Sequence, residues 1–126
     1  MNNVLRVLLG VPALLFMTIA IRWIVDPTGA AAELDMDLLT GGGRGSQIGD
    51  IGGLFFSMSV MIALALYTAE RIWFYAPAIM LSAVAVYRTL AFLLQDAGFS
   101  TSSVGVEVVV ASLLVFASSR LEPLRR

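Results

Sequence analysis

The segment Trp73–Gln95, WFYAPAIMLSAVAVYRTLAFLLQ, decides the fold. It is longer than the ~20 residues that a helix needs to cross the ~30 Å hydrocarbon core of a bilayer. Its single charged residue is Arg88. A charge inside a membrane span costs at least ~2.5–3.5 kcal/mol on insertion scales, so such a residue usually faces other helices and pairs with one of their groups. The segment therefore predicts a transmembrane helix with one inward-facing arginine.

Three further apolar segments, at about 4–25, 48–69 and 103–121, are long enough to span a membrane. The chain is 59% hydrophobic and only 13% charged, whereas a soluble domain carries about 25% charged residues. Short connections make consecutive helices antiparallel neighbours. We therefore expect an all-α integral membrane protein whose residues 1–126 form a single domain, a four-helix up-down bundle.

The longest connection, 26–47, contains a turn sequence at its start and a possible short interfacial helix at about 30–39. It closes with a glycine-rich stretch, 41–45, that we expect to be flexible or to need unusual backbone angles. Arginine counts predict the topology. The side that holds both termini has five arginines against two acids, and the other side has three against seven. The positive-inside rule then places both termini in the cytoplasm and the 26–47 loop in the periplasm of a bacterial inner membrane.

Several kinds of chemistry are disfavoured by composition. The chain has no cysteine and no histidine, and all eight basic residues are arginine. It therefore lacks a thiol nucleophile, the commonest metal ligand and general base, and a Schiff-base lysine. We expect no catalytic residue, no cofactor and no metal site. With a net charge of -1 and no basic patch, nucleic acid is not an expected partner either.

A polar layer is predicted near the periplasmic face, because Asp50, Arg88 and Glu107 approach the same leaflet from three helices. Arg22 approaches it from the first helix, and Arg44 lies close by in the loop. Three interpretations are open: a structural ion-pair network that fixes helix register, a site where Arg88 meets a polar or anionic group of a ligand, or an acid/base pair of carboxylates. One arginine for two acids leaves a carboxylate unpaired unless another arginine joins.

The second span also carries small residues at four-residue spacing, which allow another helix to approach closely. They are Gly45, Gly49, Gly53 and Ser57, hereafter the small-residue stripe. The stripe predicts packing within the bundle or, alternatively, contact with a second copy or a partner protein.

The order of polar positions resembles a family of small four-helix bacterial inner-membrane proteins of unknown function, and more distantly the DoxX-type membrane proteins. The residues that carry the resemblance are Arg44 through Gly52-Gly53, Tyr87-Arg88, Asp96-Ala97-Gly98 and Glu107. It covers the chain from Arg44 onward. The resemblance implies the four-helix fold and the polar layer, and the DoxX-like group adds quinol oxidation or redox complexes as a lead.

The sequence favours a small accessory or scaffold protein that packs through its glycine-rich helix against itself or a larger membrane complex. The alternative is a binder of a lipid, quinone or other lipophilic ligand at the polar layer. A small transporter or a membrane isomerase-like enzyme is a third hypothesis. Membrane lipid is the partner common to all three.

Overall fold

The computed structural model describes residues 2–121, so the charges of Glu122, Arg125 and Arg126 that entered the topology prediction lie outside it. This part of the chain is helical throughout its regular elements. They are α1 (Asn3–Val25), α2 (Pro27–Glu33), α3 (Gly41–Ser46), the π-helix η1 (Gln47–Gly52), α4 (Gly53–Thr68), α5 (Ile72–Leu94) and α6 (Thr101–Ser119).

Four helices are long and apolar enough to cross a membrane: Asn3–Val25, Gly41–Thr68, Ile72–Leu94 and Thr101–Ser119. Three of them match their predicted limits to within two residues at each end. The second begins seven residues before its predicted start at residue 48, because α3, η1 and α4 follow one another without a break.

Of the two expectations for the glycine-rich stretch 41–45, unusual backbone angles are found at one position: Gly41 takes a left-handed conformation (φ 58°) at the turn where the helix starts. The residues after it are helical, as α3, so the stretch is not an irregular loop. The short helix expected at about 30–39 is present but lies earlier, as α2, where Pro27 takes the first position and Asp26 caps it by accepting from the Gly29 N–H.

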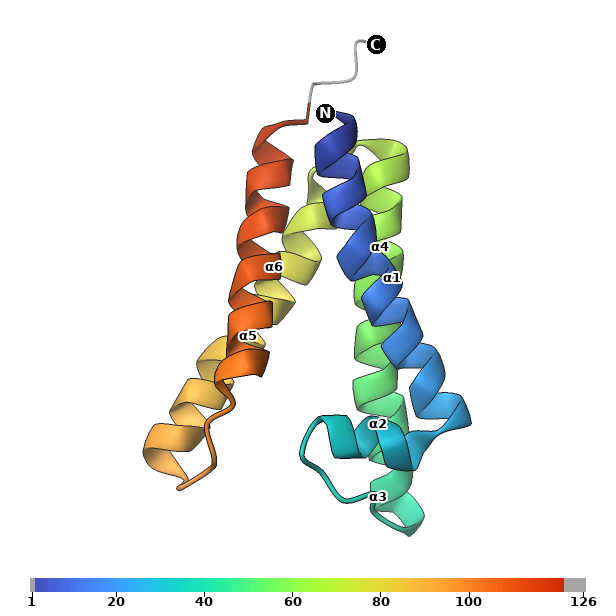
Figure 1. The fold of residues 1–126 in the computed structure, drawn as a ribbon, viewed down its shortest axis with the longest axis vertical. Coiled ribbons are helices and arrows are strands. Elements are labelled where there is room, and N and C mark those ends of the chain that lie inside the picture. The colour runs from blue at the N-terminus through green and yellow to red at the C-terminus, as the bar shows by residue number, and fades with distance from the viewer. Residues whose placement is uncertain (1, 122–126) are drawn as a thin grey trace.

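The long helices run antiparallel in sequence order, as predicted. Both described ends of the chain lie at one end of the bundle, which we call the terminal end, and α2 and α3 lie at the opposite, loop end (Figure 1). Consecutive helices pack against each other, whereas α1 meets α6 over a short stretch only. The pair α1/α4 and the pair α5/α6 therefore touch near the terminal end and separate toward the loop end (Figure 1).

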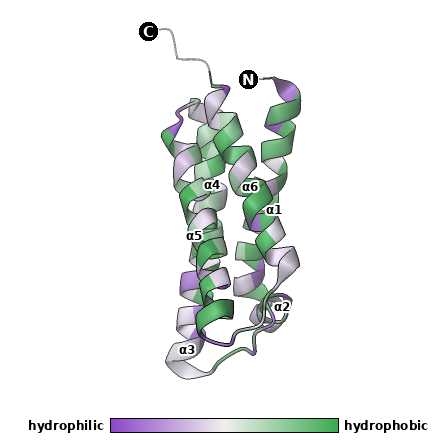
Figure 2. Ribbon diagram, turned by 90° about the vertical axis from the view of Figure 1, so that its left-hand side faces the viewer, coloured by the Kyte–Doolittle hydropathy of each residue, from purple (hydrophilic) through white to green (hydrophobic). Residues whose placement is uncertain are grey.

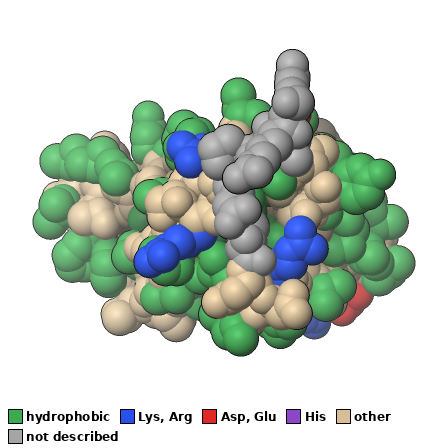
Figure 3. Space-filling model, turned by 90° about the horizontal axis from the view of Figure 1, so that it is seen from above, with side chains coloured by type: hydrophobic (Ala, Val, Ile, Leu, Met, Phe, Trp, Pro, Cys, Tyr) green, Lys and Arg blue, Asp and Glu red, His purple; other side chains and the backbone are tan. Residues whose placement is uncertain are grey.

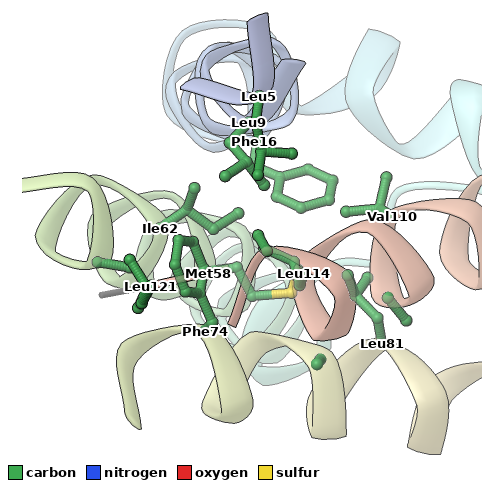
Figure 4. Packing of buried hydrophobic residues seen from close by; sticks show 14 residues of the cluster. Leu5, Leu9, Phe16, Met58, Ile62, Phe74, Leu81, Val110, Leu114 and Leu121 are labelled. Carbon is green, nitrogen blue, oxygen red and sulfur yellow. The ribbon is translucent and has the colours of Figure 1, made fainter. Parts of the chain in front are cut away.

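The main core lies where the two pairs meet (Figure 4). Its largest fully buried side chains come from all four long helices and include Leu9, Ile62, Phe74 and Leu114. A hydrogen bond adds to this packing: the buried Ser59 Oγ donates to the Ala13 carbonyl at 2.6 Å, which joins α4 to α1.

A second, smaller apolar cluster lies at the loop end, where the fully buried Trp23 packs with Ala30 and Ala31 of α2. It attaches α2 to the end of α1.

The outer surface of the long helices is apolar. In the 18-residue apolar stretch of each span, at most 28% of the residues are buried inside the protein. Many large apolar side chains, among them Leu14, Ile24, Leu93 and Val109, are left exposed. Figure 2 shows hydrophobic residues along the lengths of the helices and more polar ones toward the loop end. Lipid covers such a surface without cost, so these features fit a multi-pass membrane protein.

The terminal end carries basic side chains, seen in blue in Figure 3. Two of them hold neighbouring segments together there: Arg6 Nη2 donates to the Leu66 carbonyl and Arg71 Nη2 to the Leu121 carbonyl, each at 3.4 Å.

Candidate functional site

An ion pair joins α5 to α6 between the main core and the loop end. Arg88 Nε donates to Glu107 Oε1 at 2.8 Å. The Glu107 side chain is only 11% exposed and that of Arg88 is 36% exposed. The structure thus pairs the arginine of the third span with a carboxylate of the fourth, one of the two acids that the sequence places at a similar depth. The short connection between these two helices, 95–100, keeps them side by side at this level.

Asp50 does not join this pair. It lies on η1 with an exposed side chain and is not within ion-pair distance of any arginine in residues 2–121. The cause is the rotation of η1, which determines the side of this helix that faces α1. Gly52 is buried against Trp23 of α1, and a residue two positions away on a helix lies nearly opposite. Asp50 therefore points outward, away from α5 and α6.

The other two arginines of the predicted layer bind elsewhere. Arg22 Nη1 donates to Glu33 Oε1, and its Nε lies 3.5 Å from Asp26 Oδ2, so it attaches α2 to the end of α1. Arg44 Nε donates to the Leu39 carbonyl at 2.9 Å. A single polar layer shared by all these residues is therefore wrong, because the separation of the helix pairs at the loop end divides it.

The small-residue stripe does not pack within the described chain, so that interpretation is wrong too. All four members are exposed, and a Cβ added to any of its three glycines would meet no other side chain or helix within 4 Å. The close helix contact instead uses Gly52, where an added Cβ would lie 3.1 Å from the Cβ of Trp23. The stripe therefore lies on the outer face of the second span.

A cavity of about 580 Å³ lies between the two helix pairs. Most of its lining is apolar and comes from α1, the loop after α2, η1, α4, α5 and α6. Its apolar residues include Phe16, Ile19, Leu54, Phe55, Met58 and Leu81. The polar side chains gather toward the loop end, and they are Glu33, Arg88, Ser102, Ser103 and Glu107.

The role of Gln47 in holding the loop that precedes it was not predicted from the sequence. Its side chain is buried, its Oε1 accepts from the Leu39 N–H at 2.8 Å, and its Nε2 donates to the Asp37 carbonyl at 3.0 Å. These bonds hold the 34–40 loop against η1, and residues 34 and 36 of that loop line the cavity. A lone amide beside a predicted apolar span is the signal that would have indicated it.

The volume and lining of this cavity suit an amphiphilic ligand. Ligand pockets are typically ~300–1,000 Å³, mostly apolar, with a few placed polar groups, and this cavity has those properties. No family model, curated protein or solved structure matches this chain. The fold fits a multi-pass membrane protein with four apolar spans and a cavity between its helix pairs. The resemblance to DoxX-type proteins stays a prediction.

Proposed function

We propose that this protein binds a lipophilic ligand in the cavity between its helix pairs, with the polar end of the ligand at Arg88 and Glu107. The observation that carries the proposal is an apolar cavity of about 580 Å³ whose wall contains a partly buried ion pair. A purely structural ion pair needs no apolar cavity of this size beside it.

Access from the bilayer supports the same proposal. Leu15 and Val106 line the cavity and are also 44% and 47% exposed on the outer surface. Because lipid surrounds that surface, a hydrophobic molecule reaches the cavity without crossing water. The ion pair at the loop end then meets the polar end of the molecule, while its chain lies among the apolar residues nearer the core.

A pair of variants on α4 tests the proposal. Leu54→Trp places a larger side chain into the cavity, whereas Phe56→Trp changes an exposed residue two positions along. Native mass spectrometry after mild-detergent purification is expected to show a lipophile bound to the wild type and to Phe56→Trp and lost from Leu54→Trp. Equal occupancy in all three proteins, or none in any of them, contradicts binding in this cavity.

For topology, we propose that both termini are cytoplasmic, in a bacterial inner membrane. The described charges support this arrangement. The terminal end has Arg6, Arg71 and Arg120 against Glu70, whereas the loop end is rich in acids, namely Asp26, Glu33, Asp35, Asp37, Asp50 and Asp96. An arginine excess marks the cytoplasmic side.

Because the chain has no cysteine, single-cysteine variants report the topology cleanly. A membrane-impermeant maleimide on intact spheroplasts is expected to label Gly98→Cys and not Glu70→Cys. The reverse pattern contradicts the proposed orientation.

A second candidate function, that of an accessory subunit or homo-oligomer, is favoured by the exposed small-residue stripe. A helix face of small residues lets a second helix approach closely in lipid. In membranes, Gly49→Cys is expected to give a cross-linked dimer or heteromer, while Ala83→Cys on the outer face of α5 is not. Equal cross-linking at both positions indicates random collision and contradicts an interface at the stripe.

A further inference from the structure

Only one of the two carboxylate oxygens of Glu107 accepts a hydrogen bond. Its Oε1 accepts from Arg88, but its Oε2 is buried and has no partner. Within residues 2–121 it is the one buried side-chain oxygen that has no hydrogen-bond partner. An unsatisfied buried acceptor destabilises a protein, and a charged one does so more strongly. The site therefore lacks a hydrogen-bond donor.

The two serine hydroxyls of α6 that line the cavity lie outside hydrogen-bond distance of Glu107 Oε2. Ser103 lies one turn before Glu107, and its hydroxyl accepts from Ser100 Oγ at 3.0 Å in the cap of the helix. Ser102 Oγ lies 3.4 Å from the same Ser100 hydroxyl. The missing donor is therefore not supplied by the serines that share the cavity.

Arg88, the partner of Glu107, has hydrogen-bond donors that are not used. Its Nε is used by Glu107, and its two terminal nitrogens make no hydrogen bond within the described chain. Two residues that line the cavity therefore have unused hydrogen-bonding groups: Glu107 has a buried acceptor without a donor, and Arg88 has terminal N–H groups without an acceptor in the described chain. The terminal torsion of a glutamate is broad, so Oε2 turns toward an incoming donor without movement of the helix.

We infer that the polar end of the ligand is an uncharged hydroxyl group, as in a long-chain alcohol or a phenol with a hydrocarbon tail; this inference rests on the proposed function. The hydroxyl donates to Glu107 Oε2 and accepts from a terminal N–H of Arg88. A hydroxyl is the simplest group that does both at once.

The alternatives fit less well. A carboxylate or phosphate has no proton to donate when ionised, and it adds negative charge beside Glu107, so Oε2 stays without a donor. An ammonium donates but lies beside the Arg88 charge. An ether, an ester or a carbonyl only accepts, so Glu107 Oε2 stays unsatisfied.

Four probes of equal chain length test the inference in nanodiscs: a dodecyl alcohol, its methyl ether, dodecanoate and dodecylamine, each brominated on a carbon near its polar end, because Trp23 also lies at the loop end. Bromine quenches tryptophan, and Trp23 packs against Ile19, Met36 and Ile51, which line the cavity or the loop beside it. The background variant Trp73→Phe leaves Trp23 as the only tryptophan.

We expect the alcohol to bind about ten-fold to a hundred-fold more tightly than the ether, the range for one hydrogen bond to a buried charged group. Glu107→Gln keeps the size of the side chain but replaces one oxygen by an NH₂ group, and it is expected to abolish that preference. The control Asp50→Asn, outside the cavity, is expected to retain it.

The outcomes separate the two proposals. Four probes that bind with similar affinity, or dodecanoate or dodecylamine as the tightest, overturn the hydroxyl inference and leave the lipophile-binding function standing. Saturable quenching by none of the probes overturns the binding function itself. Retention of the alcohol preference in Glu107→Gln removes Glu107 Oε2 as its origin.

Discussion

Exchange of the charges of the α5–α6 ion pair is the strongest test of the structure. The variants are Arg88→Glu, Glu107→Arg and the double exchange. Each single variant places two like charges side by side where Glu107 is 11% and Arg88 36% exposed. The loss of one partner of a fully buried pair costs ~3–5 kcal/mol. Because Arg88 is partly exposed, we expect each single variant to lose ~2–3 kcal/mol and the exchange to recover at least half of that.

The free energy of unfolding is measured by SDS titration in mixed micelles, followed by far-UV circular dichroism. The quantity of interest is the coupling energy of the double-mutant cycle. Asp50 supplies the control, because it was an equally plausible partner of Arg88 by sequence and the structure places it elsewhere. Arg88→Glu combined with Asp50→Arg is expected to be no more stable than Arg88→Glu alone.

Two results refute this reasoning. The first is a coupling energy below ~0.5 kcal/mol, the scatter expected for independent sites. The second is equal rescue by Asp50→Arg and Glu107→Arg, which indicates a diffuse charge effect in place of the α5–α6 contact.

Two further predictions concern the loop end. Gln47→Leu removes both bonds to the 34–40 loop, so we expect a loss of ~1–3 kcal/mol and faster amide hydrogen exchange in that loop, with unchanged exchange there counting against the contact. Gly52→Leu forces a clash with Trp23 whereas Gly53→Leu enters open space, so only the former is expected to lower thermal stability and shift tryptophan fluorescence; equal effects contradict the packing.

The sequence alone was sufficient to predict the helical spans and their antiparallel order. Crossing a bilayer requires a continuous apolar run of a certain length, and short connections restrict the order in space, so both are properties of local sequence. The same reasoning placed Arg88, Asp50 and Glu107 at similar depths on three helices. It left open which of the two acids pairs with Arg88, and only the structure shows that the partner is Glu107.

What depended on helix rotation could be known only from the tertiary structure. Asp50 and the small-residue stripe were predicted to face other helices, yet both face outward, while Gly52 and Gln47 face inward. In a soluble protein the polar side of a helix marks the outside. Here lipid-facing and core-facing side chains are equally apolar, so the sequence does not mark which side of a span is inside.

The cavity could not be predicted from the sequence either, because it depends on how the helices pack. The composition of the spans determined that the chain belongs in a membrane, but the separation of the α1/α4 and α5/α6 pairs at the loop end depends on how four helices pack together. That packing leaves a cavity beside the Arg88–Glu107 pair, and no local pattern of residues determines the space between helices.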